Sequence, residues 1–286
     1  MVALAGTVTK LCNASIRDYI NPYSYLEWPE SVDIEQWSTS PELISLYGMR
    51  VYESLSPAEQ KRLSFYEAVN FFSLNIHGEK SLIEGLAQRL YRKGNDMVSP
   101  YIHHFLDEEN KHMVYFGGFC ARYAGKVYPD RKMVFDREYA PGEEDVLFFA
   151  KVLVFEEIVD VHNKRMAKDN RLVPVIRQIN FMHHRDESRH LAFGRLLVKD
   201  LFERYSPTWS RETLDGVREY MKNYITATWK EYYNPAVYKD AGLANPFDIQ
   251  EEALQAEVTR AHRKEISARC IQYLIDTGIL TELPQL

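Results

Sequence analysis

Apolar residues recur at helical spacing along most of the chain, and prolines divide this pattern into long windows. The first window begins at the sequence SPAE (residues 56–59), a capping box with proline at the first helical position, and it continues to about residue 91. Further helices are expected over residues 99–124, 143–168 and 174–205, between Pro207 and Pro235, and over 248–277, where Asp248 is expected to cap the last helix. Because strand-like alternation is scarce, the pattern predicts an all-α bundle with core helices of about 25–35 residues.

The first 50 residues differ from the rest of the chain. Prolines and tryptophans interrupt this segment, at Pro22, Trp28, Pro29, Trp37 and Pro41. We therefore expect an arm that is anchored by aromatic side chains and contains little regular structure. No long apolar core follows a basic patch near the start, so no signal peptide is expected.

Several of the expected helices place acidic and histidine residues on their apolar faces. These residues are Glu79 in the first helix, Glu109 and His112 in the second, Glu156 in the third, and His183, Glu187 and His190 in the fourth. A single buried histidine is usually a hydrogen-bonded core residue. Seven such residues on four helices need a different explanation, because an unpaired buried carboxylate costs several kcal/mol unless it is neutralised, paired or bound to a cation.

The spacing of these residues is typical of a site for two metal ions. Two of the helices carry an E-x-x-H pair, and each of the other two supplies one glutamate, which is the ligand set of di-iron and di-manganese carboxylate proteins. Carboxylates neutralise and bridge two divalent cations, and imidazole favours transition metals over calcium. Glu79 and Glu109 lie roughly 18 and 14 Å from the turn that joins their helices, and Glu156 and Glu187 lie roughly 18 and 20 Å from theirs. All four carboxylates can therefore meet at one level of an antiparallel bundle.

The sequence leaves one ligand position open between two adjacent glutamates. Glu156 shares its helix face with Phe149 and Val159, whereas Glu157 shares a side with Lys164. We therefore favour Glu156 as the ligand and keep Glu157 as the alternative.

Two units of a glutamate-bearing helix followed by an E-x-x-H helix resemble the ferritin-like superfamily over residues 57–206. The run HHRDESRH adds a narrower feature, because it places His183 four residues before Glu187 and gives H-x-x-x-E-x-x-H. A third histidine at this position resembles the arylamine N-oxygenase family, which includes p-aminobenzoate N-oxygenase and a relative from the chloramphenicol pathway.

The resemblance implies a ferritin-like fold and a di-iron site with three histidines and four carboxylates. Carried over to this chain, the general ligand positions fall on Glu79, Glu109, His112, Glu156, Glu187 and His190, with His183 as the extra ligand. Enzymes of this family activate O2 as a peroxo species and oxidise an amine toward hydroxylamine, nitroso or nitro products. Two Fe ions are thus the expected cofactor, with Mn also possible, and O2 is the expected co-substrate. No motif in the sequence identifies the amine.

The expected organisation is a single domain over residues 1–286. It comprises an N-terminal arm (1–55), a four-helix di-metal core (56–206) and additional helices (207–286). The expected partners are a small-molecule amine, an external electron donor, since no flavin or ferredoxin motif occurs, and a second copy of the chain in a homodimer, as in the family.

Charge and composition exclude several other classes of protein. The chain has 45% hydrophobic and 27% charged residues, which argues against a disordered protein, and no stretch is long and apolar enough to predict a membrane span. A net charge of −6 gives no reason to expect nucleic acid or an anionic membrane as a partner. Three widely spaced cysteines are typical of free thiols in a reducing cytoplasm.

Three other functions remain open from the sequence. A di-iron hydroxylase, desaturase or oxidase that acts on carbon would share every expected ligand except His183. An iron-storage protein would form a hollow shell. A purely structural bundle would pair its buried acids with arginines, and metal analysis would distinguish it from the others.

Overall fold

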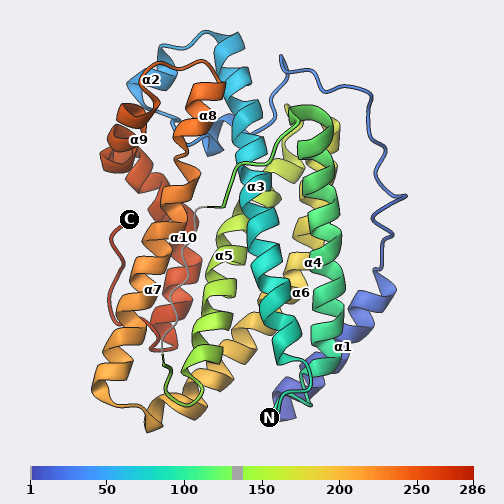
Figure 1. The fold of residues 1–286 in the computed structure, drawn as a ribbon, viewed down its shortest axis with the longest axis vertical. Helices are drawn as coiled ribbons and strands as arrows, with labels where there is room; N and C mark the ends of the chain where they lie inside the picture. Colours follow the sequence, from blue (N-terminus) through green and yellow to red (C-terminus); the bar gives the residue numbers. More distant parts are fainter. Residues whose placement is uncertain (1, 131–137) are drawn as a thin grey trace.

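The computed structural model describes residues 2–130 and 138–286. Its core consists of four long helices that lie side by side in Figure 1: α3 (Pro57–Arg89), α4 (Ser99–Phe119), α5 (Glu143–Lys168) and α6 (Pro174–Tyr205). They are connected as two helical hairpins, α3–α4 and α5–α6, and each hairpin packs along most of its length. The all-α fold expected from the sequence is confirmed, and the described residues contain no β-strand.

The remaining helices cover the outside of this core (Figure 1). α7 (Arg211–Tyr232) and α10 (Glu257–Asp276) pack against α5, and the short α8 (Pro235–Asp240) packs against α3 and against α9 (Pro246–Gln255). Short helical segments complete the structure: η1 (Pro41–Leu43), α2 (Arg50–Glu53), the π-helical turn η2 (Cys120–Ala124) and η3 (Ser206–Thr208). No helix among the described residues is long and apolar enough to cross a membrane.

The starts of the core helices follow the local signals in the sequence. The Ser56 hydroxyl accepts a hydrogen bond from the Glu59 backbone N–H at 3.4 Å, and a Glu59 carboxylate oxygen accepts one from the Ser56 N–H at 2.8 Å. The expected capping box is therefore present. Gly142 precedes α5 with φ of 75°, and a Cβ atom there would lie 2.2 Å from the Tyr205 ring. Only glycine fits this position without strain.

The N-terminal segment corrects one expectation. Residues 2–17 form a regular helix, α1 (Val2–Arg17), that packs against α4 and α6. Leu4 and Val8 are buried, and Leu11 and Cys12 pack against the core. This i, i+4, i+7, i+8 stripe is helical. This helix was not predicted from the sequence. The irregular part of the segment, which contains the prolines and tryptophans, begins only after Arg17.

The last expected helix is also corrected, because the structure divides it in two. Ala256 has extended backbone angles (φ −62°, ψ 139°) and separates α9 from α10. The Thr259 hydroxyl donates to the Ala256 carbonyl at 3.0 Å and thereby stabilises the bend. α9 begins after Asn245, so Asp248 lies in the first turn and is not the capping residue.

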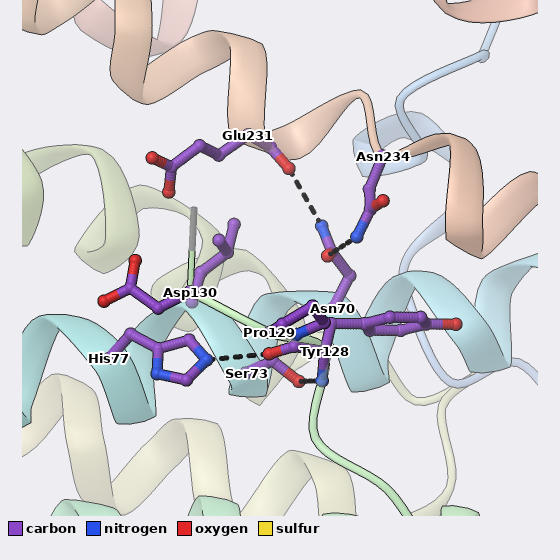
Figure 2. Close-up of a pocket in the computed structure, with 9 residues that line it drawn as sticks. Asn70, Ser73, His77, Tyr128, Pro129, Asp130, Glu231 and Asn234 are labelled. Atoms are coloured by element: carbon purple, nitrogen blue, oxygen red, sulfur yellow. Dashed lines mark hydrogen bonds between the residues drawn. The ribbon is translucent and has the colours of Figure 1, made fainter. Parts of the chain in front are cut away.

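A small pocket lies where residues 128–130 pass between α3 and α7 (Figure 2). The His77 Nε2 atom lies 2.7 Å from the Tyr128 carbonyl oxygen, and the Tyr128 N–H donates to the Ser73 hydroxyl at 3.0 Å. On the α7 side, Asn70 donates to the Glu231 carbonyl at 3.3 Å. These bonds hold residues 128–130 on α3. The pocket has a volume of only about 20 Å³, which is space for about one water molecule.

Candidate metal centre

The seven residues expected at the site are all buried, and they point into the space between the four core helices. Their exposed fractions are between 0% and 2%: Glu79 on α3, Glu109 and His112 on α4, Glu156 on α5, and His183, Glu187 and His190 on α6. Two groups of possible ligand atoms form within this set, and in each group all atoms lie within 4.8 Å of one another. The first comprises Glu79, His112, His183 and Glu187, and the second comprises Glu109, Glu187 and His190.

In the first group, two imidazoles and two carboxylates from three helices surround one point. The His183 Nε2 atom lies 2.9 Å from Glu187 Oε1 and 3.4 Å from Glu79 Oε1. The His112 Nδ1 atom lies 3.6 Å from the same Glu187 oxygen and 3.8 Å from the same Glu79 oxygen. Side chains that are far apart in the sequence thus meet between α3, α4 and α6.

In the second group, His190 lies between two carboxylates. Its Nδ1 atom is 2.9 Å from Glu109 Oε1 and 3.3 Å from Glu187 Oε1. Glu109 also approaches the first group, because its Oε2 atom is 3.0 Å from His112 Nδ1. Glu187 belongs to both groups, so the two groups adjoin.

Glu156 and Glu157 have different surroundings. Neither carboxylate oxygen of Glu156 has a hydrogen-bond partner among the described residues, and the charges of Glu187, His190 and Glu109 all act on it. Glu157 instead accepts a hydrogen bond from Arg195 Nε at 2.6 Å. Glu156 therefore faces the four-helix interior without a partner, whereas the charge of Glu157 is already balanced. Glu156 does not belong to either group of ligand atoms within 4.8 Å.

The second nitrogen of each imidazole is also occupied. His190 Nε2 lies 2.8 Å from Glu108 Oε2, His112 Nε2 lies 3.4 Å from Asp186 Oδ2, and His183 Nδ1 lies 2.7 Å from the amide nitrogen of Asn163. Such contacts fix the orientation of a histidine ring, so that its other nitrogen can bind a metal ion.

The side chains of Glu108 and Asp186 connect the two E-x-x-H helices, α4 and α6. Each is the residue directly before the glutamate of its own E-x-x-H pair, and each contacts the histidine of the other helix. Arg189 joins them, since its Nη2 atom lies 2.6 Å from Glu108 Oε1 and 2.6 Å from Asp186 Oδ1. Glu108 was not predicted from the sequence. The identical position of Glu108 and Asp186 before the two pairs was the available signal.

Other acids and histidines near the site serve different contacts. Asp160, one turn after Glu156, lies 2.5 Å from His184 Nδ1 on the outer side of α6. His103 contacts the exposed Tyr91, with 3.0 Å between its Nε2 atom and the tyrosine hydroxyl. These residues do not reach the cluster of seven.

The buried acids and histidines of the cluster shift one another's pKa values. Burial, and next the charge of Glu109, raise the pKa of Glu79 well above its usual value, and burial with Glu187 does the same to Glu156. Although burial opposes it, the charge of Glu109 raises the pKa of His112 to about 9. Burial likewise opposes ionisation of Glu187, but the charges of His190 and His183 lower its pKa to about 2. The cluster therefore attracts positive charge.

The residues fit a pair of divalent metal ions. Four carboxylates carry four negative charges, which two divalent cations would balance with the imidazoles neutral. Both oxygens of Glu156, Oε2 of Glu79 and Oε2 of Glu187 are buried and have no hydrogen-bond partner among the described residues. Buried polar atoms are normally satisfied, so these free atoms are suited to bind metal ions. Mixed carboxylate and imidazole donors suit iron or manganese.

Four core helices around a buried Glu/His cluster define a ferritin-like bundle with a candidate di-metal site, and comparison with known proteins identifies an oxidoreductase. The family model of p-aminobenzoate N-oxygenase AurF matches residues 4–278. The chain therefore belongs to this family, whose members are di-iron enzymes. The family and the fold that the sequence suggested are both confirmed.

Solved structures with the same fold include R2-like ligand-binding oxidases. The enzyme from Sulfolobus acidocaldarius has a TM-score of 0.50 and 18% sequence identity, with 97% of this chain and 92% of that chain covered. A second R2-like ligand-binding oxidase, a mutant with an anaerobically reconstituted Mn/Fe cofactor, has a TM-score of 0.48 and 16% identity, with 91% and 93% covered. No curated protein matches the chain at a significant level.

Proposed function

We propose that the protein is an O2-dependent N-oxygenase that oxidises an amine toward a hydroxylamine, nitroso or nitro product. Membership of the p-aminobenzoate N-oxygenase family supports this reaction. The seven buried residues would hold two iron ions, and such a centre supplies the redox chemistry that activates O2 for transfer of oxygen to a substrate.

The proposed ligands are the residues that the structure gathers between the four helices. Glu79, His112 and His183 would serve one metal ion, and Glu109 and His190 the other. Glu187 belongs to both groups of ligand atoms and would contribute to holding both ions. Glu156, whose two oxygens have no other partner, completes the set of four carboxylates.

The single observation that carries the proposal is the position of His183. Its Nε2 atom lies between Glu79 and Glu187 at 3.4 and 2.9 Å, inside the ligand group and not in the surrounding core. Two E-x-x-H pairs alone are general to ferritin-like di-metal proteins. A third imidazole adds a strong neutral donor, which changes the electron density at the centre without changing its charge.

The protein around the cluster excludes water and fixes the ligand rings. Phe105 stacks on His190 with ring centroids 4.0 Å apart, and Phe116 meets His183 edge-on at 4.9 Å. Both phenylalanines are buried. Replacing bulk water by such a shell protects a reactive centre from side reactions.

Three further features belong to the proposal. The electrons come from a separate donor, because no flavin or ferredoxin motif accompanies the site in the sequence. The active form is a homodimer, as expected from the family. The cytoplasm is the proposed location, since Cys12, Cys120 and Cys270 are free thiols and suit a reducing compartment.

A neighbouring pair of histidines provides the test. His183 faces the cluster, whereas His184 contacts Asp160 on the outer side of α6. We expect His183→Ala to lose metal and amine oxidation, and His184→Ala to keep both. The measurements are iron per chain after anaerobic reconstitution, and mass spectrometry of the products formed from a panel of anilines with O2 and a chemical reductant.

Three outcomes would contradict the proposal. Full metal content and full rate in His183→Ala would remove the basis for N-oxygenase chemistry. Products that carry the new oxygen on carbon would instead indicate a hydroxylase. A hollow shell of many subunits in size-exclusion chromatography would favour iron storage.

A further inference from the structure

A groove runs along the outside of the core between α3, α5 and α7, next to the metal centre. One part of it is a cavity of about 180 Å³. Its lining is mainly apolar and consists of Gly78, Ser81, Leu82, Phe148, Lys151, Val152, Phe155 and Tyr224. Cavities of about 150 Å³ with apolar walls bind benzene-sized molecules, so this one has room for a single aromatic ring.

The inner wall of the cavity is continuous with the helix segments that carry two proposed ligands. Gly78 directly precedes Glu79 on α3, and Phe155 directly precedes Glu156 on α5. Successive side chains of a helix point about 100° apart, so Glu79 and Glu156 can face the centre while their neighbours face the groove. The cavity and the metal centre are thus on two sides of the same pair of helices, at the same level.

The Phe155 ring packs on α3 at the residue directly before Glu79. It lies directly on Gly78, where a Cβ atom would be only 2.4 Å from the ring Cζ atom. Phe155 is 9% exposed, so the ring is reached from the groove and yet is held among core residues. The absence of a side chain at position 78 is what allows the ring to occupy this place.

A second contact of the same kind lies seven residues away on each helix. A Cβ atom at Gly85 of α3 would lie 2.0 Å from the Phe148 ring of α5. Phe148 and Phe155 both line the cavity, one at each end. Only the Gly78–Phe155 contact adjoins the glutamates of the centre.

We propose that the substrate amine reaches the metal centre from this groove, and that the Phe155 ring on Gly78 is the residue pair that sets the width of the passage. The occupant is an uncharged amine on an apolar body of about one ring. The cavity of Figure 2 does not compete for this role, because its volume of about 20 Å³ excludes an aromatic ring. The inference rests on the proposed function, since it takes the substrate to be an amine.

The test changes the passage in two independent ways. Phe155→Ala removes the ring and widens the passage, whereas Gly78→Ala adds a Cβ atom at the contact with the ring and narrows it. Phe155→Leu serves as a milder change should Phe155→Ala lose metal. The matched control is Gly118→Ala on α4, where a Cβ atom would lie 2.8 Å from Trp28, away from the groove.

Binding is measured first, with the iron-loaded protein and without O2, so that no turnover occurs. Calorimetry with aniline and with the two-ring 4-aminobiphenyl gives the ratio of the two dissociation constants. We expect Phe155→Ala to shift this ratio at least tenfold in favour of the larger amine, Gly78→Ala to shift it in favour of the smaller amine, and Gly118→Ala to leave it unchanged. Phe148→Ala is expected to shift it less than Phe155→Ala, since Phe148 lies farther from the glutamates.

Product analysis with O2 separates this inference from the proposed function. If amines bind with the expected shifts but are oxidised on carbon, the proposed passage is supported and the proposed N-oxygenase function is contradicted. If anilines are oxidised on nitrogen while the variants at positions 78 and 155 keep the wild-type ratio and rates, the passage lies elsewhere and the inference is overturned. An equal shift in Gly118→Ala would also overturn it.

Discussion

The Nε2 atom of His190 on α6 lies 2.8 Å from Oε2 of Glu108 on α4. Because Nδ1 of the same ring faces Glu109 and Glu187, the contact with Glu108 determines which imidazole nitrogen faces the cluster. Burial opposes ionisation of Glu108, but the hydrogen bond and charge of His190 keep its pKa below the usual value. An ionised acceptor makes the imidazole a stronger donor toward a metal ion.

Glu108→Gln is therefore expected to weaken metal binding without removing a ligand. Loss of such an outer carboxylate typically costs 10- to 100-fold in metal affinity, roughly the effect we expect here. Asp107→Asn is the control, because Asp107 is exposed and pairs only with Lys111 among the described residues. Competition with a chelator of known affinity gives both dissociation constants. Equal constants for the two variants would contradict the role of Glu108.

Glu156→Gln and Glu157→Gln are expected to separate metal binding from stability. Glu156→Gln removes a carboxyl group whose two oxygens have no hydrogen-bond partner among the described residues, so we expect iron per chain to fall with little loss of folding stability in the metal-free protein. Glu157→Gln breaks the ion pair with Arg195 and is expected to cost about 1–3 kcal/mol of unfolding free energy with full metal content. Elemental analysis and denaturant unfolding measure the two effects. The reverse pattern would make Glu157 the ligand.

Metal affinity is expected to increase with pH. Without metal, the pKa of His112 is raised to about 9, so this imidazole holds a proton near neutral pH, and the pKa values of Glu79 and Glu156 are also raised, which favours their protonated forms. A metal ion must displace these protons, and affinity then rises about tenfold per pH unit for each proton released. Chelator competition between pH 6 and 8, with proton release followed in unbuffered solution, checks this. A flat profile would contradict it.

Glu67 provides a pH effect that is independent of the metal centre. This buried residue of α3 is hydrogen-bonded to Ser45, which in turn contacts the Tyr238 hydroxyl at 2.9 Å. Burial raises its pKa from 4.5 to about 7. A raised folded-state pKa favours the folded protein below pH 4.5, and this contribution is lost as pH rises to about 7.

Glu67→Gln should remove this dependence. For the wild type, the contribution lost between pH 4.5 and 8 is on the order of 3 kcal/mol. The difference in unfolding free energy between variant and wild type, both loaded with metal, isolates the effect of this one group. We expect this difference, variant minus wild type, to become more positive as pH rises above 4.5. A difference that does not change with pH would show that the pKa of Glu67 is not raised in the folded protein.

Much of the fold and of the candidate site could be predicted from local sequence. The capping box at Ser56, the prolines and the apolar stripes define the core helices, because helix starts and helix faces depend on residues within a few turns. The same periodicity placed the E-x-x-H pairs of α4 and α6 on inward faces, and the structure indeed buries them. The α1 helix carries such a stripe too, although it was not predicted from the sequence.

Other features depended on which helix packs against which. That Glu157 meets Arg195 while Glu156 has no partner follows from the contact of α5 with α6, and that Glu108 reaches His190 follows from the contact of α4 with α6. The place of Phe155 on Gly78 likewise exists only because α3 and α5 approach closely. The sequence by itself determined which residues face inward. Only the tertiary structure decided which of them meet, because contacts between helices depend on side-chain packing across the whole bundle.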